Sequence, residues 1–181
     1  MPVDAPGESR SVVAFVAVGS NIDPERNIEM ALRRLQQLAV LHATSTFYRT
    51  PPLERPEQPM FVNGVCEISS GLSARQLKFQ VLRRIEDELA RKRTEDRHAP
   101  RTIDLDLLLY GDAVIEEAGL RVPDPDIRRR AFIAVPLLEL APGLKLPGSL
   151  EPLASLPIAQ SMEGLVPLVH FAEQLRQRLM S

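Results

Sequence analysis

The sequence predicts an α+β fold, a ferredoxin-like sandwich in which an antiparallel sheet has helices packed on its face. Two periodicities support this prediction. Short runs with apolar residues at alternate positions indicate strands, whereas apolar residues spaced three and four apart indicate helices. Along the chain these segments follow the order β-α-β-β-α-β, which is typical of that sandwich. Because the chain has 181 residues, we expect a single domain over residues 1–181.

The first strand and the first helix are predicted from residues 12–38. Residues 12–18 form an apolar run, and a turn at 19–21 follows it. Asp23 then stands as an N-cap before Pro24, which suits the first position of a helix. The apolar face of this helix consists of Ile28, Ala31, Leu32, Leu35 and Leu38.

The middle of the chain predicts two strands and a second helix. The strands cover residues 44–49 and 61–68, and a proline-rich loop at 50–59 separates them. Ser73 and Gln76 have the spacing of a capping box, which marks the start of a helix. The apolar stripe of that helix consists of Leu77, Val81, Leu82, Ile85 and Leu89.

A fourth strand is predicted at residues 101–110, with short extended pieces near 113–115 and 120–122. A third helix is expected over 128–140. Pro136 should kink or shorten that helix, because proline lacks the backbone N–H and its ring clashes with the preceding turn.

The remaining residues, 143–181, form a proline-rich tail rather than a second domain. The tail ends in an amphipathic helix whose apolar face consists of Leu168, Phe171, Ala172, Leu175 and Leu179. The sequence does not identify the surface that this helix contacts.

Composition excludes several classes of protein. The net charge of −2 and a pI of about 6.0 argue against a general nucleic-acid-binding protein, so nucleic acid is not an expected partner. The single cysteine, Cys66, excludes a disulfide within the chain and a metal site built on cysteines. Residues 1–10 lack the apolar segment of a signal peptide, and no apolar run is long enough to span a membrane. We therefore expect a cytoplasmic protein with no membrane partner.

Residues 91–110 contain the most informative motif for function. Asp104 and Asp106 lie two apart in the predicted strand, so both side chains project from the same face of the sheet. The other face of this strand carries Ile103, Leu105 and Leu107, which we expect in the core. Two hard oxygen ligands on one strand suit Mg²⁺, which completes its coordination with water and substrate phosphates.

Four arginines come just before this strand: Arg91, Arg93, Arg97 and Arg101. Guanidinium groups present planar forks of donors to phosphate oxygens, so the motif predicts a magnesium–polyphosphate site for phosphoryl transfer. Each half alone has a simpler interpretation, because paired aspartates are common in strands and arginine-rich segments are usually solvated. The order of the two halves, with Pro100 ending any preceding helix, favours the site. No P-loop or Gly-rich dinucleotide motif is present in the sequence to bind the phosphates instead.

Several motifs together resemble the 6-hydroxymethyl-7,8-dihydropterin pyrophosphokinase family. They run over about residues 12–142 and read A-V-G-S-N at 17–21, F-Y-R-T-P-P-L at 47–53, Q-P-x-F-x-N at 58–63, I-E at 85–86, R-x-R-x-x-x-R at 91–97, P-R-T-I-D-L-D at 100–106, R-x-F at 130–132 and P-L-x-E-L-A-P at 136–142. The stretch P-R-T-I-D-L-D-L-L-L-Y-G is highly specific. The resemblance implies the ferredoxin-like fold and an enzyme of folate biosynthesis.

The resemblance also implies roles for the charged residues. Asp104 and Asp106 would hold two Mg²⁺ ions that bridge the ATP phosphates, and Asp106 is also a candidate for assisting deprotonation of the substrate hydroxyl. Arg91 and Arg101 would act with them in catalysis as phosphate clamps. The residues implied to contact ATP are Glu86, Arg91, Arg93, Arg97, His98, Arg101, Asp124 and Arg130.

A second set of residues matches the pterin pocket of the family, namely Thr50, Pro51, Leu53, Phe61, Asn63, Asp104 and Phe132. Phe61 and Phe132 would hold the ring between them, and the Asn63 amide would hydrogen-bond its edge. Without the surrounding motifs, the two phenylalanines would be interpreted as ordinary core residues.

The implied reaction is transfer of pyrophosphate from ATP to the hydroxymethyl group of the pterin, with release of AMP. Other enzymes of the folate pathway are possible partners. Four departures from the family pattern leave an alternative open: Ala90 and Ala99 each replace a glycine, His98 replaces a tryptophan, and Asp124 replaces a histidine that faces the nucleotide phosphates. The alternative is a divergent paralogue of the same fold that has weak turnover, acts on another pterin, or only binds a pterin or nucleotide. An RNA-binding module is a third class, but the first strand offers only Phe15 for base stacking.

Overall fold

A central antiparallel sheet organises the computed structural model, which describes residues 11–53, 56–90 and 100–180. Its strands are β1 (Val12–Ser20), β2 (Val40–Thr44), β3 (Tyr48–Thr50), β4 (Phe61–Ser70), β5 (Asp104–Tyr110) and β8 (Val166–Pro167). Within the described residues these form a six-stranded sheet of order β5-β1-β4-β3-β8, and β2 also pairs with β4. Every pair is antiparallel. The predicted ferredoxin-like α+β fold is confirmed.

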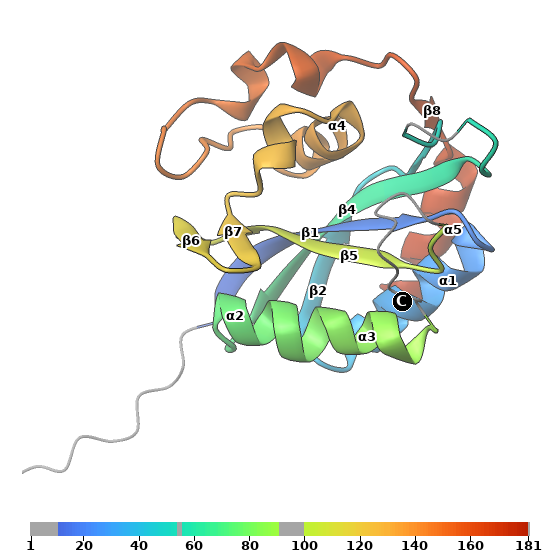
Figure 1. Ribbon diagram of the computed structural model, residues 1–181, viewed down its shortest axis with the longest axis horizontal. Coiled ribbons are helices and arrows are strands. Elements are labelled where there is room, and N and C mark those ends of the chain that lie inside the picture. The colour runs from blue at the N-terminus through green and yellow to red at the C-terminus, as the bar shows by residue number, and fades with distance from the viewer. Residues whose placement is uncertain (1–10, 54–55, 91–99, 181) are drawn as a thin grey trace, which may run out of the picture.

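Helices cover both faces of this sheet (Figure 1). One face carries α1 (Pro24–Gln36), α5 (Val169–Leu179) and a continuous helical stretch made of α2 (Ala74–Gln76), the π-helix η1 (Leu77–Leu82) and α3 (Arg83–Glu88). The opposite face carries α4 (Ala131–Leu140). Each face has its own apolar cluster, so the sheet is sandwiched between two cores.

Helix α1 begins at Pro24 as predicted, and its predicted face is buried at Ile28, Ala31, Leu32 and Leu35. The expectation that the side chain of Asp23 caps this helix is wrong. Asp23 has φ 41° and ψ 54° and makes no side-chain cap hydrogen bond. Capping needs an extended backbone at this position, which directs the side chain back at the first free N–H groups.

The strand predicted at residues 44–49 is two separate strands, β2 and β3. The ladder is interrupted at Ser45, whose hydroxyl accepts a hydrogen bond from the Val65 N–H at 2.9 Å. Phe47 then turns into the core, where it is fully buried. Gly64 makes this possible, because a Cβ there would lie 2.6 Å from the Phe47 ring.

The second predicted helix has the expected capping box, with Ser73 Oγ accepting from the Gln76 N–H and the Gln76 side chain accepting from the Ser73 N–H. Its middle, however, is the π-helix η1. The predicted stripe is nonetheless buried at Leu77, Val81, Leu82 and Ile85.

The strand β5 begins at Asp104, three residues later than predicted. A two-stranded hairpin of β6 (Ile115–Glu117) and β7 (Leu120–Val122) follows, near the expected extended pieces. After the 3-10 helix η2 (Pro125–Arg128), α4 runs past Pro136 without ending there.

The tail crosses from α4 to the far edge of the sheet. Two 3-10 helices, η3 (Leu153–Ser155) and η4 (Pro157–Gln160), lie against α4, and β8 then pairs with β3. The predicted amphipathic helix is confirmed as α5, and it packs against α1 and β2 of the same chain. In the part of the chain described here, no helix is long and apolar enough to cross a membrane.

Candidate active site

Three neighbouring strands place polar groups in a row on the α4 face of the sheet. In the sheet register Gly19 of β1 lies opposite Asn63 of β4 on one side and opposite Asp104 of β5 on the other. The next row contains Asp106 beside Ala17. The prediction that Ile103, Leu105 and Leu107 face the core is confirmed, since all three are buried against the helices of the opposite face.

Gly19 is needed in this row because it leaves space for the amide of Asn63. A Cβ at position 19 would lie 2.5 Å from Asn63 Oδ1, closer than real contacts allow. The same amide donates through Nδ2 to Thr50 Oγ1 at 2.8 Å. The Asn63 side chain is therefore held across the strand β1, with its orientation set by a buried threonine.

The two aspartates make an electrostatically crowded site. Burial, together with the charges of Asp104 and Asp124, raises the pKa of Asp106 to about 7 from 3.8. Burial also raises the pKa of Asp124, although the hydrogen bond from the Asp126 N–H and the positive charge of Lys78 oppose this rise. Carboxylates as close as Asp104 and Asp106 favour a bound cation, because the positive charge offsets the repulsion between them.

Arg101 closes one end of this site. Its guanidinium is hydrogen-bonded to a carboxylate oxygen of Asp104. Its backbone N–H donates to Asn21 Oδ1 at 2.7 Å, and its carbonyl accepts from the Asn21 N–H at 3.1 Å. The Asn21 amide also donates to Gln58 Oε1 and to the Pro59 carbonyl, both at 3.4 Å. Asn21 thus joins the end of β1, the segment before β5 and the proline-rich loop.

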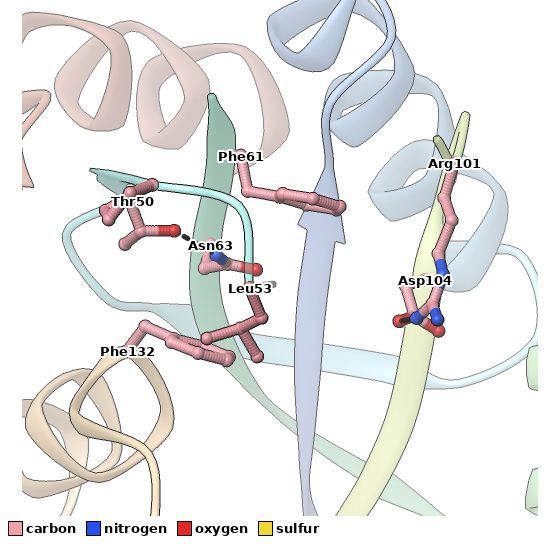
Figure 2. Close-up of a pocket in the computed structure, with 8 residues that line it drawn as sticks. Thr50, Leu53, Phe61, Asn63, Arg101, Asp104 and Phe132 are labelled. Atoms are coloured by element: carbon pink, nitrogen blue, oxygen red, sulfur yellow. Dashed lines mark hydrogen bonds and ion pairs between the residues drawn. The ribbon is translucent and has the colours of Figure 1, made fainter. Parts of the chain in front are cut away.

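One cavity brings together every residue that the family resemblance assigned to the pterin pocket. Its lining consists of Thr50, Pro51, Leu53, Phe61, Asn63, Arg101, Asp104 and Phe132. Figure 2 shows Asn63 between the side chains of Phe61 and Phe132, with Asp104 at the start of β5 and Arg101 just before it across the opening. Phe61 begins β4 and Phe132 lies in the first turn of α4, so the two aromatic rings come from the sheet and from the layer above it.

An adjoining hollow connects this cavity to both aspartates. Its lining includes Gly19, Asn63, Asp104, Asp106 and Phe132. Asp104 therefore contributes to both spaces. The arrangement could hold a flat polar heterocycle beside two carboxylates whose chemistry suits a cation.

The other predicted site residues that the structure describes do not line these two spaces. Glu86 is buried, and its Oε1 accepts a hydrogen bond from the Leu105 N–H at 2.8 Å, which ties α3 to β5. Arg130 is the N-cap residue of α4, two positions before Phe132. Asp124 Oδ1 accepts from the Asp126 N–H at 2.8 Å and caps η2. Arg91, Arg93, Arg97 and His98 lie outside the described residues.

Two contributors were missed by the sequence prediction. Asn21 lies in the motif A-V-G-S-N, which does not show its contacts, and Lys78 lies outside every motif. The oxygen and nitrogen atoms of Asn21 contact segments 37 and 80 positions away. The positive charge of Lys78 lowers the pKa values of Asp106 and Asp124 against the larger effect of burial. The spacing of residues in the sequence predicts neither the contacts of Asn21 nor the effect of the Lys78 charge.

A sequence comparison identifies the family that this chain is similar to. The family model described as 7,8-dihydro-6-hydroxymethylpterin-pyrophosphokinase matches residues 15–142. The chain is 41% identical over 141 residues to the 2-amino-4-hydroxy-6-hydroxymethyldihydropteridine pyrophosphokinase of Haemophilus influenzae, covering 76% of this chain and 87% of that protein. The enzyme of the same name from Pseudomonas aeruginosa is 40% identical over 136 residues, covering 74% of this chain and 83% of that protein.

Longer relatives contain a matching segment. The chain is 36% identical over 148 residues to the Folic acid synthesis protein fol1 of Schizosaccharomyces pombe, covering 80% of this chain but only 20% of that protein. Among solved structures, a Plasmodium falciparum HPPK-DHPS protein with pteroate superposes with a TM-score of 0.68 at 11% identity, covering 97% of this chain and 43% of that one. The chain thus spans less than half of that structure, and the likeness concerns the fold alone.

Proposed function

This chain belongs to the 7,8-dihydro-6-hydroxymethylpterin-pyrophosphokinase family, and we propose that it transfers pyrophosphate from ATP to 6-hydroxymethyl-7,8-dihydropterin and releases AMP in folate biosynthesis. One observation carries the proposal at the level of the site. The residues that match the pterin pocket of the family line one cavity, and Asp104 joins that cavity to the aspartate pair.

The cavity suits a pterin because it combines two aromatic side chains with a fixed amide. A flat heterocycle gains from contact with the faces of Phe61 and Phe132. The Asn63 amide offers both a donor and an acceptor to the polar edge of the ring. Because the hydrogen bond to Thr50 fixes this amide at 2.8 Å, little conformational entropy is lost when the pterin binds.

Asp104 and Asp106 fit a magnesium site by their chemistry. They project from one face of β5 beside each other, and Asp106 is crowded enough by negative charge to have a raised pKa. Across the described residues, no group of three or more His, Cys, Asp or Glu side chains is placed to hold a metal. Two carboxylates are nevertheless the usual protein contribution to Mg²⁺, which takes its other ligands from water and phosphates. Bound there, the two Mg²⁺ ions would neutralise phosphate charge.

The chain's own residues position the reactants. The substrate hydroxyl attacks the β-phosphorus of ATP and loses its proton, for which Asp106 is the candidate acceptor; the bond from that phosphorus to the AMP oxygen breaks, and AMP leaves with the electron pair. In this proposal the pocket directs the hydroxymethyl group of the pterin towards Asp104, where ATP phosphates would lie. Arg101 stabilises negative charge on the phosphates as the bond breaks. Positioning and charge compensation lower the barrier, with little covalent chemistry required from the protein.

A divergent enzyme with weak or altered activity is a second candidate, and Asp124 is the observation that favours it. Its carboxylate adds negative charge near Asp106. That charge opposes the binding of ATP phosphates, whereas the intact aspartate pair and pterin pocket favour activity.

The proposed function is tested by mixing the protein with MgATP and 6-hydroxymethyl-7,8-dihydropterin and measuring AMP by chromatography. We expect AMP to form only when both substrates and magnesium are present. Omission of the pterin and omission of magnesium are the matched controls. Binding of both substrates without AMP formation would support the second candidate instead.

The relatives that carry this domain within longer folate-synthesis proteins support other enzymes of that pathway as partners. The matching segment occupies only part of those chains, so partnership is part of the proposal.

A further inference from the structure

The C-terminal tail pairs with the first two residues of strand β3. Leu168 N–H donates to the Phe47 carbonyl at 2.8 Å, just before β3 begins. Within the strand, Tyr48 lies opposite Pro167 and Arg49 lies opposite Val166. The tail therefore makes β3 an internal strand, bordered by β4 on one side and by β8 on the other.

The tail next reaches the wall of the proposed pterin pocket. At Gly164, which has φ +71°, an added Cβ would lie 3.7 Å from Cδ of Pro51. Pro51 follows the last residue of β3 and lines the cavity. Its ring thus lies between the tail turn at residues 162–165 and the pocket.

The start of β3 is fixed by the same tail. The ring of Phe47 meets that of Phe171 on α5 edge to face, with centroids 5.5 Å apart and planes at 66°. Phe47 is fully buried. Because this end is anchored in the core, a displacement of the turn at 162–165 acts on the other end, at Thr50 and Pro51.

We propose that the tail turn at residues 162–165, together with β8, is a positioning element of the pterin pocket, with Gly164 setting the place of Pro51. The inference rests on the proposed function, since it concerns the same pocket. The family model matches residues 15–142, so this element lies beyond the matched region. Gly164 is a positioning residue that acts through Pro51 and Thr50 on Asn63, which hydrogen-bonds Thr50.

This arrangement predicts a selective effect on substrate binding. Pro51, Thr50 and Asn63 line the pterin cavity, whereas the aspartates are held on β5, which lies beyond β4 and β1 from β3 in the sheet. A shift of Pro51 therefore changes the fit of the pterin and leaves the phosphate site in place. A merely structural tail would instead lower stability and affect both substrates alike.

The test compares Gly164→Val with Gly111→Val. Gly111 also has a positive φ, of +51°, and an added Cβ there would lie 3.0 Å from Val12, at the opposite end of β5 from Asp104. Both variants should lower Tm. We expect Gly164→Val alone to raise the KM and the Kd for the pterin, by about fivefold or more, and to change the KM for ATP by less than about twofold.

Gly164→Ala serves if the valine variant does not fold, because alanine is strained at the positive φ of +71° and so disturbs the turn, while its Cβ, 3.7 Å from Pro51, adds no clash. The same measurements in a Pro51→Ala background give a double-mutant cycle. We expect the Gly164 substitution to lose most of its effect on pterin binding there. Unchanged pterin affinity in the Gly164 variants, or an equal change in Gly111→Val, would overturn the inference. Wild-type protein that binds no pterin would contradict the proposed function instead.

Discussion

At the scale of single residues, Asp106 shows how the site is prepared for a cation. It lies on β5, the edge strand beside β1, and burial together with the charges of Asp104 and Asp124 raises its pKa to about 7. A raised pKa means that the folded protein without metal holds this proton more tightly than the unfolded chain does. As the pH rises from about 4 to about 7, the free energy of unfolding therefore falls, because the folded state must give up this proton.

Asp106→Asn should therefore stabilise the metal-free protein at high pH. The amide is close in shape and carries no charge, so at about pH 8 we expect the free energy of unfolding to rise by about 2 kcal/mol, with a smaller gain at about pH 5. Urea denaturation with a chelator present at the two pH values measures this. Asp112→Asn, in the exposed turn after β5, is the matched control. Equal stability of Asp106→Asn and wild type at the higher pH would show that the ionised form of Asp106 does not destabilise the fold.

Activity should depend on both aspartates of β5. Asp104→Ala and Asp106→Ala each remove a proposed metal ligand, so we expect turnover to fall by at least about a thousandfold while the protein still folds. AMP production at saturating substrates measures the loss, and circular dichroism checks the fold. Asp112→Ala should retain the wild-type rate. Near-normal turnover in either site variant would remove the metal assignment.

Asp124 has a structural role that complicates a simple exchange. Its side chain caps η2 through the Asp126 N–H, so Asp124→His removes a negative charge and also a cap worth about 1 kcal/mol. Asp124→Asn keeps the cap and removes only the charge. We expect the affinity for a non-hydrolysable MgATP analogue, measured by calorimetry, to improve by about 1–2 kcal/mol in the histidine variant and by a smaller amount in the asparagine variant.

The same affinity in all three proteins would mean that Asp124 does not oppose the nucleotide. The second candidate function would then lose its main support. In this structure Arg128 is hydrogen-bonded to Glu151, and the cations whose charge lowers the pKa of Asp124 are Lys78 and Arg121.

Residue-level prediction succeeded where the backbone itself fixes the side chain. The alternation along a strand placed Asp104 and Asp106 on one face without any knowledge of their neighbours. It could not foresee that Glu86 would accept from the Leu105 N–H, because that contact depends on how α3 lies against β5. The residues that the resemblance assigned to the pterin pocket line one cavity, a grouping that spacing alone could not give for positions as distant as Thr50 and Phe132.

At the scale of secondary-structure elements, the central strand β1 leaves space for the site, because position 19 has no side chain. Gly19 gives the Asn63 amide a path across the strand, and a Cβ would lie 2.5 Å from its oxygen. The strand thus contributes space to the site in addition to its main-chain pairing.

Gly19→Ala should therefore weaken pterin binding selectively. The displaced Asn63 amide can no longer hydrogen-bond the polar edge of the ring. We therefore expect the pterin Kd to rise by about tenfold or more, while the Kd for the ATP analogue changes little. Fluorescence titration with the pterin measures the first value and calorimetry the second. Gly143→Ala, where an added Cβ meets nothing within 4 Å, is the control. A loss of ATP affinity without a loss of pterin affinity would place the pocket on the wrong side of the site.

Element boundaries were predicted less well than element types, for local reasons. The strand predicted at 44–49 has suitable residues throughout, but Ser45 uses its hydroxyl as the partner of a ladder N–H and divides the strand. In the helix at 74–88, the apolar spacing is compatible with an α-helix, and the π-helical geometry of Leu77–Leu82 depends on packing against the sheet. Pro136 does not end α4, because packing of the buried residues around it outweighs the lost hydrogen bond.

At the scale of the whole molecule, the sheet separates structural and chemical functions. One face carries the larger apolar cluster under α1, α3 and α5, whereas the other carries the site residues beside α4 (Figure 1). The helix order and the sheet class followed from the sequence. The covering of the second face by α4 and residues 153–160 did not, because the irregular tail has no periodicity that would show where it lies.

The most direct test of the account is phosphorus NMR of a complete reaction mixture containing the protein, MgATP and 6-hydroxymethyl-7,8-dihydropterin. If the aspartate pair and the pterin pocket form one site for transfer at the β-phosphorus, the spectrum will show AMP and a pterin diphosphate ester in equal amounts. Asp106→Ala will produce neither on the same timescale. Formation of ADP and a pterin monophosphate, or hydrolysis of ATP without any pterin product, would contradict the proposed function.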